Sequence, residues 1–314
     1  MDRQTNRRLN QLDRRLQRVY SEALQSALRR EQEALRRLQN FAPDPNLSAA
    51  ANEARARQFL MRLEQQTGFV NNISSDLARS GELATQMIRG DALNVFNGAY
   101  HGNVTAIARQ LGGTQFQGSF SVFDRNTINA IFNGEQSRIG QLRGFQGSFE
   151  QVGNRLIFDR QRGNYFFDVA RGRISDDRAI VTKLQNALAS SMMQGDSVRQ
   201  VATRIRAITE SSRQQAVTIA RTEMLKAYNQ GKMLGHYQAE DMGIPLRKKW
   251  VATHDDRTRD DHIEMDGVTV ETDEPFIVGG VRMMYPHDPN GGAGNVVNCR
   301  CTFISEVVRS RMVA

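Results

Sequence analysis

The sequence has few cysteine, tryptophan and proline residues. Its 314 residues contain two Cys, one Trp and six Pro. The two Cys lie one residue apart, at Cys299 and Cys301, so they fit a reducing compartment or a metal site better than a disulfide framework. No run of about 18 apolar residues occurs, so we expect no transmembrane helix or membrane anchor. The charged N-terminus lacks an apolar core, so we expect no signal peptide.

The sequence also lacks proline over a long central stretch and lacks the glycine motifs of nucleotide-binding loops. No Pro occurs between Pro45 and Pro245, which permits a largely helical region. The many glycines of residues 90–165 follow no GxGxxG or P-loop pattern, so no nucleotide site is indicated. Mean hydropathy is low at -0.54, which suits extended helices with much solvated surface. A chain of this length can form two domains, or one domain with a helical extension.

A basic charge balance stands out among the features that are present. The formal net charge is +8 and is carried mainly by Arg. Such a balance favours a polyanion such as double-stranded DNA as partner, because phosphate neutralisation releases counterions. A protein that is simply basic explains the charge equally well.

Residues 1–42 are expected to form one long basic amphipathic helix. Apolar side chains recur every three or four residues from Leu9 to Leu38, and a stripe this narrow needs a partner helix from this chain or another. The Arg residues on the other faces are DNA-binding candidates, although a solvated face also explains them. They are Arg7, Arg8, Arg14, Arg15, Arg18, Arg29, Arg30, Arg36 and Arg37.

Residues 43–195 are expected to form a helical region punctuated by glycine. Ser48 is a plausible N-cap for a helix that ends near Gln66, and a further helix follows over Phe69 to Arg89. Short apolar pieces at 120–123 and 155–158 suggest short helices or a hairpin. Three more helices are predicted over residues 176–195, 197–209 and 212–242.

Residues 196–314 are expected to form a small α+β domain, in which a helix is followed by a few antiparallel strands. Strands are predicted over residues 247–253, 267–271, 276–278 and 301–308, where apolar residues alternate or cluster. Asp266-Gly267 is a hairpin signal. The fold class is therefore α+β, with a mainly helical N-terminal region.

The stretch from Trp250 to Cys301 carries most of the unusual residues, including the only Trp and both Cys. It reads Trp…Asp-x-Arg-Thr-Arg-x-x-His…Asp-Gly…Phe…Pro-His-Asp-Pro…Asn-Cys-Arg-Cys. The helix before it contains Ala-Arg-Thr-Glu and Ala-Tyr-Asn-Gln-Gly at residues 220–223 and 227–231. In order and spacing, residues 198–305 resemble the C-terminal domain of the phage Mu F-like minor head proteins, the phage head morphogenesis family.

The resemblance implies a minor capsid protein of a tailed phage, located in the virion and, during assembly, in the host cytoplasm. Several copies would bind the portal vertex or the capsid interior, with portal, major capsid or scaffolding protein and DNA as partners. They would assist head assembly, genome packaging or DNA delivery. A metal-dependent nuclease or toxin-like effector carried in the virion is the alternative, because family likeness does not fix activity.

Three chemistries can be compared in this stretch. Zinc could bind Cys299, Cys301 and His262, with His287, His254 or Asp256 as a fourth ligand. Arg259 stands where the family pattern has the first Cys of a Cys-x-x-Cys pair, which weakens this hypothesis. A magnesium-dependent nuclease would use four carboxylates, although the Arg residues among them favour Arg–Asp pairing. They are Asp255, Asp256, Asp260 and Asp261. Cys-His nucleophilic catalysis has the weakest support, since no signal places a His on either Cys.

A structural lock is the interpretation that we favour. A small domain with little apolar mass can hold its loops with Arg–Asp forks and side-chain hydrogen bonds around an aromatic core. No catalytic residue is assigned. The predicted lock residues are Arg221, Glu223, Trp250, Asp255, Asp256, Arg257, Arg259, Asp266 and Asn298.

Overall fold

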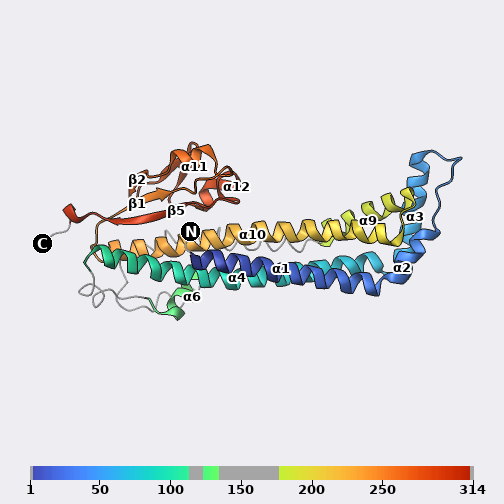
Figure 1. The fold of residues 1–314 in the computed structure, drawn as a ribbon, viewed down its shortest axis with the longest axis horizontal. Coiled ribbons are helices and arrows are strands. Elements are labelled where there is room, and N and C mark those ends of the chain that lie inside the picture. Colours follow the sequence, from blue (N-terminus) through green and yellow to red (C-terminus); the bar gives the residue numbers. More distant parts are fainter. Residues whose placement is uncertain (1–2, 113–122, 134–176, 312–314) are drawn as a thin grey trace. The chain divides into compact units, whose positions relative to one another are not determined.

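The structure is a computed structural model that describes residues 3–112, 123–133 and 177–311 (Figure 1). The apolar pieces at 120–123 and 155–158 lie wholly or mostly outside this range. The chain divides into two units. The helical unit comprises Gln11–Met87 and Asp168–Val217, and the C-terminal unit comprises Met1–Asn10, Ile88–Phe167 and Thr218–Ala314. Three long helices, α1 (Arg3–Arg30), α4 (Phe69–Gln110) and α10 (Val198–Asp241), contribute residues to both units.

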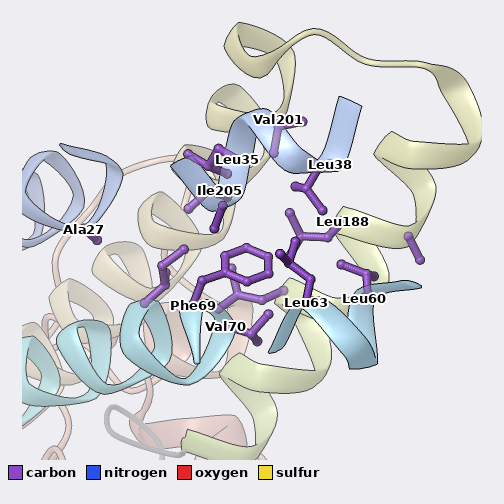
Figure 2. Close-up of a cluster of buried hydrophobic side chains, with 14 of the residues drawn as sticks. Ala27, Leu35, Leu38, Leu60, Leu63, Phe69, Val70, Leu188, Val201 and Ile205 are labelled. Carbon is purple, nitrogen blue, oxygen red and sulfur yellow. The ribbon is translucent and has the colours of Figure 1, made fainter. Parts of the chain in front are cut away.

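The helical unit also contains α2 (Gln32–Arg37), the 3-10 turn η1 (Leu38–Asn40), α3 (Ala49–Thr67) and α9 (Asp177–Gln194). Its core gathers aliphatic side chains from all of these elements around Phe69 (Figure 2). Ser48 caps α3 as predicted by accepting a hydrogen bond from the Ala51 amide at 3.2 Å, and Gly68 ends it with a φ of 65°. The predicted helix over 176–195 is confirmed as α9.

Three predicted helix boundaries are wrong. The N-terminal helix is interrupted at Glu31, a buried carboxylate that accepts hydrogen bonds from Arg30 and Asn72 at 3.0 Å. α4 continues to Gln110 instead of ending near Arg89. The helices predicted over 197–209 and 212–242 form the single helix α10, since the Ser212 hydroxyl bonds back to the Ile208 carbonyl at 3.2 Å and leaves the backbone helical.

The apolar stripe of α1 is covered within this chain. Leu12, Leu16, Tyr20 and Leu24 are all buried. In the helical unit, α1 is tied to α10 through Asp13 and Arg213 at 2.9 Å. It is also tied to α4 through Arg30 and Asp76 at 2.7 Å. The partner that a narrow stripe requires is therefore supplied by the chain's own helices.

The C-terminal unit packs the second half of α4 closely on the second half of α10. The α10 residues at 227, 231, 235 and 239 are Ala, Gly, Gly and Ala, so one face is lined by small side chains. A Cβ on Gly231 would lie 2.3 Å from the Phe96 carbonyl oxygen, which shows how closely the backbones approach. A further short helix, α6 (Arg125–Asn133), contributes Ile128 to the core of this unit.

Two small sheets complete the C-terminal unit. The first has the antiparallel order β2–β1–β5, formed by β2 (Thr269–Glu271), β1 (Leu246–Val251) and β5 (Thr302–Val307). The second is a hairpin of β3 (Phe276–Val278) and β4 (Val281–Met283). Short elements connect them: α11 (Asp260–Glu264), η2 (Pro289–Gly291), α12 (Gly292–Val296) and, after β5, η3 (Arg309–Arg311). The predicted α+β class and its four strands are confirmed.

The hairpin signals need one correction. Asp266-Gly267 does not form a two-residue turn between β1 and β2, because the connection also contains α11. The tight hairpin lies at Gly279-Gly280, where φ values of 53° and 77° match the turn type that suits a twisted two-residue hairpin. Among the described residues, no helix is long and apolar enough to cross a membrane.

Candidate functional site: a buried polar seam and a Cys-His cluster

One face of α10 carries buried polar side chains at seven-residue spacing. Thr222, Asn229 and His236 are each at most 1% exposed. The Asn229 amide donates to the Cys301 carbonyl at 3.1 Å and accepts from the Thr302 hydroxyl at 2.8 Å. Thr222 accepts from the Asn298 amide at 3.4 Å. These contacts hold the chain from Asn298 into β5 against α10, and we call this face and its partners the polar seam.

His236 is a fully buried member of the polar seam. Its Nδ1 lies 2.8 Å from the Ser305 hydroxyl, and its Nε2 lies 2.8 Å from the Thr272 hydroxyl. Burial, with Lys248 and Lys232 nearby, lowers the pKa of His236 to about 3. A neutral ring with both nitrogens engaged by protein hydroxyls is suited to fixing β5 and β2, and has no free nitrogen to offer a substrate.

Two lysines extend the polar seam. The Lys232 ammonium donates to the Phe303 carbonyl. Lys248 is 0% exposed, and its ammonium donates to the Glu274 and Met284 carbonyls at 2.9 Å each. Buried cations remain charged only when such acceptors replace water. Both lysines therefore cross-link loops and strands of the C-terminal unit.

The predicted metal residues His262, Cys299 and Cys301 come together in the structure. Their ligand atoms all lie within 4.8 Å of one another, and all three residues are buried. His262 Nδ1 is 3.4 Å from the Cys301 sulfur and 3.5 Å from the Cys299 sulfur. His262 Nε2 faces the Asn295 side-chain oxygen at 3.3 Å. We call these three residues the Cys-His cluster.

The two thiols are free and differ in acidity. The hydrogen bond from the Cys299 thiol, helped by His262, lowers the pKa of Cys301 to about 5. The same pairing, together with burial, raises the pKa of Cys299. The Cys-His cluster thus places two thiols of unequal acidity beside an imidazole, in a core that also contains Trp250 and Phe276.

His287, the other predicted ligand, is completely buried but is not part of this group. Neither of its ring nitrogens has a hydrogen-bond partner. Burial, the largest effect, lowers the pKa of His287 to about 3; the nearby Cys299 backbone opposes this shift, and the neighbouring His262 adds to it. Its backbone is in the left-handed region, with a φ of 69° that a non-glycine residue rarely adopts. The ring thus lies beside Cys299 and His262 of the Cys-His cluster, and neither nitrogen makes a hydrogen bond of good geometry.

Trp250 is buried in an aromatic cluster, and Asp255 is paired with arginine. Trp250 is 0% exposed, and its ring packs edge-on against His262 and Phe276, with centroids 5.8 and 5.1 Å away. Asp255 pairs with both terminal nitrogens of Arg300 and accepts from the Arg257 amide at 3.0 Å. The Arg300 guanidinium holds the pKa of the Asp255 carboxyl well below its usual range.

Two further lock candidates hold backbone. Asp266 accepts from the Ala252 amide and from His254, both at 2.8 Å, and these bonds lower its pKa. Arg259 donates to the Val297 carbonyl at 2.9 Å. Asn298 has a φ of 57°, which asparagine tolerates better than most residues.

The remaining candidates divide by exposure. Arg221, Asp256 and Arg257 are exposed, whereas Glu223 on the same helix as Arg221 is buried. Burial raises the pKa of Glu223 to about 7. Asp255, Asp256, Asp260 and Asp261 do not gather, since the Cys-His cluster is the single metal-sized group of acidic, His and Cys ligands within residues 3–112, 123–133 and 177–311.

The DNA-binding candidates on α1 and α2 are exposed from Arg7 to Arg37, except for the half-buried Arg8. Arg30 is paired with Glu31 and Asp76, and Arg37 lies 3.5 Å from Glu33. Arg14, Arg18 and Arg29 share one face of α1, since spacings of 4 and 11 residues are close to whole helical turns of about 3.6 residues. A polyanion could reach this face.

The polar seam and the β3–β4 hairpin were not predicted from the sequence. The seven-residue spacing of Thr222, Asn229 and His236 was the signal for the seam, because it places polar groups on one helix face. Gly279-Gly280 between Val278 and Val281 was the signal for the hairpin. Lys248 gave no comparable signal, since a strand lysine is usually exposed.

Comparison with known proteins places this architecture in context. Residues 182–304 match the family described as Phage Mu protein F like protein. The chain is 33% identical over 127 residues to minor head protein GP7 of Bacillus phage SPP1. The aligned region covers 40% of this chain and 40% of that protein. The resemblance to Mu F-like minor head proteins is therefore confirmed for the C-terminal region, which includes α10, the polar seam and the Cys-His cluster.

Two other relatives bear different names. A protein of Enterococcus faecalis (strain ATCC 700802 / V583) named NAD(+)--arginine ADP-ribosyltransferase EFV is 37% identical over 128 residues, or 41% of this chain and 26% of that protein. The uncharacterized protein YqbB of Bacillus subtilis (strain 168) is 27% identical over 134 residues, or 41% of this chain and 43% of that protein. The chain thus spans less than half the length of these curated relatives. No solved structure matches.

Proposed function

We propose that this protein is a minor head protein of a tailed phage. In this role several copies lie at the portal vertex or in the capsid interior and assist head assembly, genome packaging or DNA delivery. The observation that supports the proposal most is the family match over residues 182–304, together with the similarity to a minor head protein. The polar seam is compatible with this role, because its side chains hold the segment from Asn298 into β5 against α10.

Mass spectrometry of purified heads tests the proposal. Each particle should contain several copies of the chain, co-purifying with portal, major capsid or scaffolding protein. Cross-linking before analysis should recover peptides that join this chain to one of those partners. Heads that assemble and package DNA normally without the protein, and never contain it, would refute the assignment.

Contact with double-stranded DNA is the electrostatic part of the proposal. The exposed Arg face of α1 supports it. Each lost phosphate contact should reduce the slope of log affinity against log salt by about 0.9. A variant with Arg14, Arg18 and Arg29 changed to Gln should therefore bind DNA with a slope shallower by up to about 3.

A matched control removes the same charge elsewhere in the helical unit. It carries Gln in place of Arg57, Arg62 and Arg79, which are exposed on α3 and α4. The control should keep the wild-type salt slope if α1 makes the contact. Equal loss in both triple variants would show that net charge alone attracts DNA, and no loss in either would end the DNA part of the proposal.

An enzyme is the alternative function. The similarity to a protein named as an ADP-ribosyltransferase motivates it, but the match covers 26% of that protein. The nuclease form has little geometric support, since Asp255 is paired with Arg300 and Asp256 is exposed outside any metal-sized group within the described residues. Nuclease and ADP-ribosyl transfer assays of the full chain, with Asp256→Asn as comparison, would reveal such an activity.

A further inference from the structure

We propose that the Cys-His cluster is a zinc site, with Cys299, Cys301 and His262 as ligands and His287 as the fourth. These residues supply two sulfurs and two imidazole nitrogens, a donor set typical of structural zinc. The proposal does not depend on a phage role for the protein.

The distances in the Cys-His cluster are those of a tetrahedral site. Zn–S bonds of about 2.3 Å and Zn–N bonds of about 2.0–2.1 Å at tetrahedral angles set sulfur and nitrogen about 3.6 Å apart. The His262 Nδ1 atom lies 3.4 Å from one sulfur and 3.5 Å from the other. All three ligand atoms lie within 4.8 Å of one another, so one ion can contact them together.

The surroundings of His262 fix the nitrogen that a metal would use. Its Nε2 faces the Asn295 side-chain oxygen at 3.3 Å, which holds a proton on Nε2, so Nδ1, the atom beside both sulfurs, is the one that would bind a metal. The Cys301 amide lies 3.4 Å from the Cys299 sulfur and donates to it, as amides beside metal-bound thiolates do. Outer partners of this kind orient the ligands before an ion arrives.

His287 is the unexplained group that points to a fourth ligand. Its ring is 0% exposed, and neither nitrogen has a hydrogen-bond partner. An orphaned imidazole of this kind costs free energy unless something engages it. The Cys299 backbone and His262 both act on the pKa of His287, so its ring lies beside two of the proposed ligands. A shift of the His287 ring on metal binding would complete four ligands and satisfy the orphaned nitrogen.

The proposed ion would join three segments of the C-terminal unit. His262 lies in α11, His287 lies between β4 and η2, and the two Cys lie immediately before β5. The residues around the site are apolar or buried, so the ion would be sealed from solvent. A closed site with four protein ligands has a structural role, since catalytic zinc keeps one position open.

Cobalt titration of the full-length protein tests the site. The protein is purified with a reductant and without chelators, and zinc is measured by mass spectrometry, with about one equivalent expected. After the metal is removed, added Co²⁺ should produce the visible bands of a tetrahedral site and a thiolate-to-cobalt charge-transfer band. Co²⁺ should also quench the fluorescence of Trp250, the only Trp, whose ring lies 5.8 Å from His262. Absence of both metal and charge-transfer band would overturn the proposal.

Variants assign the ligands. Cys301→Ser should abolish or shift the charge-transfer band. His254→Gln is the control and should leave the band unchanged, because His254 pairs with Asp266 outside the Cys-His cluster. Asn295→Ala keeps every ligand and should weaken metal binding about 10–100-fold without changing the band. Because Cys301→Ser could unfold the unit, the wild-type spectrum and the Asn295 variant decide the question by themselves.

His287→Gln tests the fourth ligand separately. Weaker binding with an altered visible spectrum supports His287 as a ligand. An unchanged spectrum and affinity would overturn that assignment and leave water as the fourth ligand of a three-residue site. Both results can be read only if the variant keeps the wild-type circular dichroism, which the buried but unbonded ring of His287 allows us to expect.

Discussion

Replacement of Gly231 by Ala tests the close approach of α4 and α10 in the C-terminal unit. A Cβ at this position would lie 2.3 Å from the Phe96 carbonyl oxygen and 3.2 Å from the Ala99 Cβ. The first contact is with backbone, so it cannot be relieved by rotating a side chain, and the helices must separate locally. Overpacking of this kind costs about 1–3 kcal/mol, and a rigid neighbour places the cost near the upper end.

The intrinsic helix preference acts in the opposite direction. Ala is about 1 kcal/mol better than Gly inside a helix. The net loss for Gly231→Ala is therefore about 2 kcal/mol. Gly98 is the matched control, because it is exposed inside α4 and a Cβ there would meet nothing within 4 Å. Gly98→Ala should raise stability by about 1 kcal/mol, so the same substitution has opposite signs at two helix positions.

Gly235 gives an intermediate case. Its Cβ would lie 3.1 Å from a methyl group of Val104 and 3.3 Å from the Tyr100 carbonyl oxygen, so modest movement can accommodate it. Urea denaturation followed by circular dichroism should rank the three Ala variants as Gly98, Gly235, Gly231, from most to least stable. If Gly231→Ala is as stable as Gly98→Ala, the close packing of these helices is refuted.

Three further predictions follow from the buried polar groups and the α4–α10 packing. Burial raises the pKa of Glu223 to about 7, so the free-energy cost of ionising this carboxyl in the folded state grows as pH rises from about 4.5 to 7. Glu223→Gln should therefore stabilise the protein by up to about 3 kcal/mol at pH 8 and little at pH 4. Denaturation at both pH values measures the difference. His236, with its pKa lowered to about 3, stays neutral in the folded state, so the free energy of unfolding should fall as pH drops from about 6.5 towards 3. His236→Gln should flatten that fall. An unchanged pH dependence would contradict the neutral, buried state of His236. A fragment of residues 196–314 should unfold at lower urea than a fragment of residues 88–314. The shorter fragment lacks the half of α4 whose Asn103 side chain donates to the Lys232 carbonyl of α10 at 2.8 Å. Equal urea midpoints would show that this half of α4 is dispensable.

Local signals in the sequence were sufficient where one residue decides the backbone. Ser48 and Gly68 mark the ends of α3. The continuity of α10 could not be read in this way. Ser212 resembles a helix start in sequence, and only its bond to the Ile208 carbonyl shows that the helix continues.

The Cys-His cluster was predictable from residue types, whereas the groups that hold it were not. His and Cys are metal ligands wherever they converge, so the residues themselves suggested His262, Cys299 and Cys301. Whether a polar helix residue faces solvent or core depends on what the rest of the chain packs against it. Asn229 therefore resembled an ordinary surface residue until β5 was seen to lie on α10. The domain boundaries proposed from the sequence remain predictions.

Substitutions in the segment from Asn298 to Cys301, or in the α10 residues that hold it, will change the stability of the C-terminal unit. Asn298, Cys299 and Cys301 precede β5, and α10 holds this segment through Thr222 and Asn229. A change at Asn229 would leave the Cys301 carbonyl and the Thr302 hydroxyl without their partner, and buried polar groups left unpaired each cost about 1–3 kcal/mol. Loss of function in such a variant would therefore report loss of the folded C-terminal unit, and it cannot by itself identify a catalytic group. Exposed positions such as Asp256 and Arg257 are the informative ones for activity or partner binding, because their side chains can change without removing a buried contact.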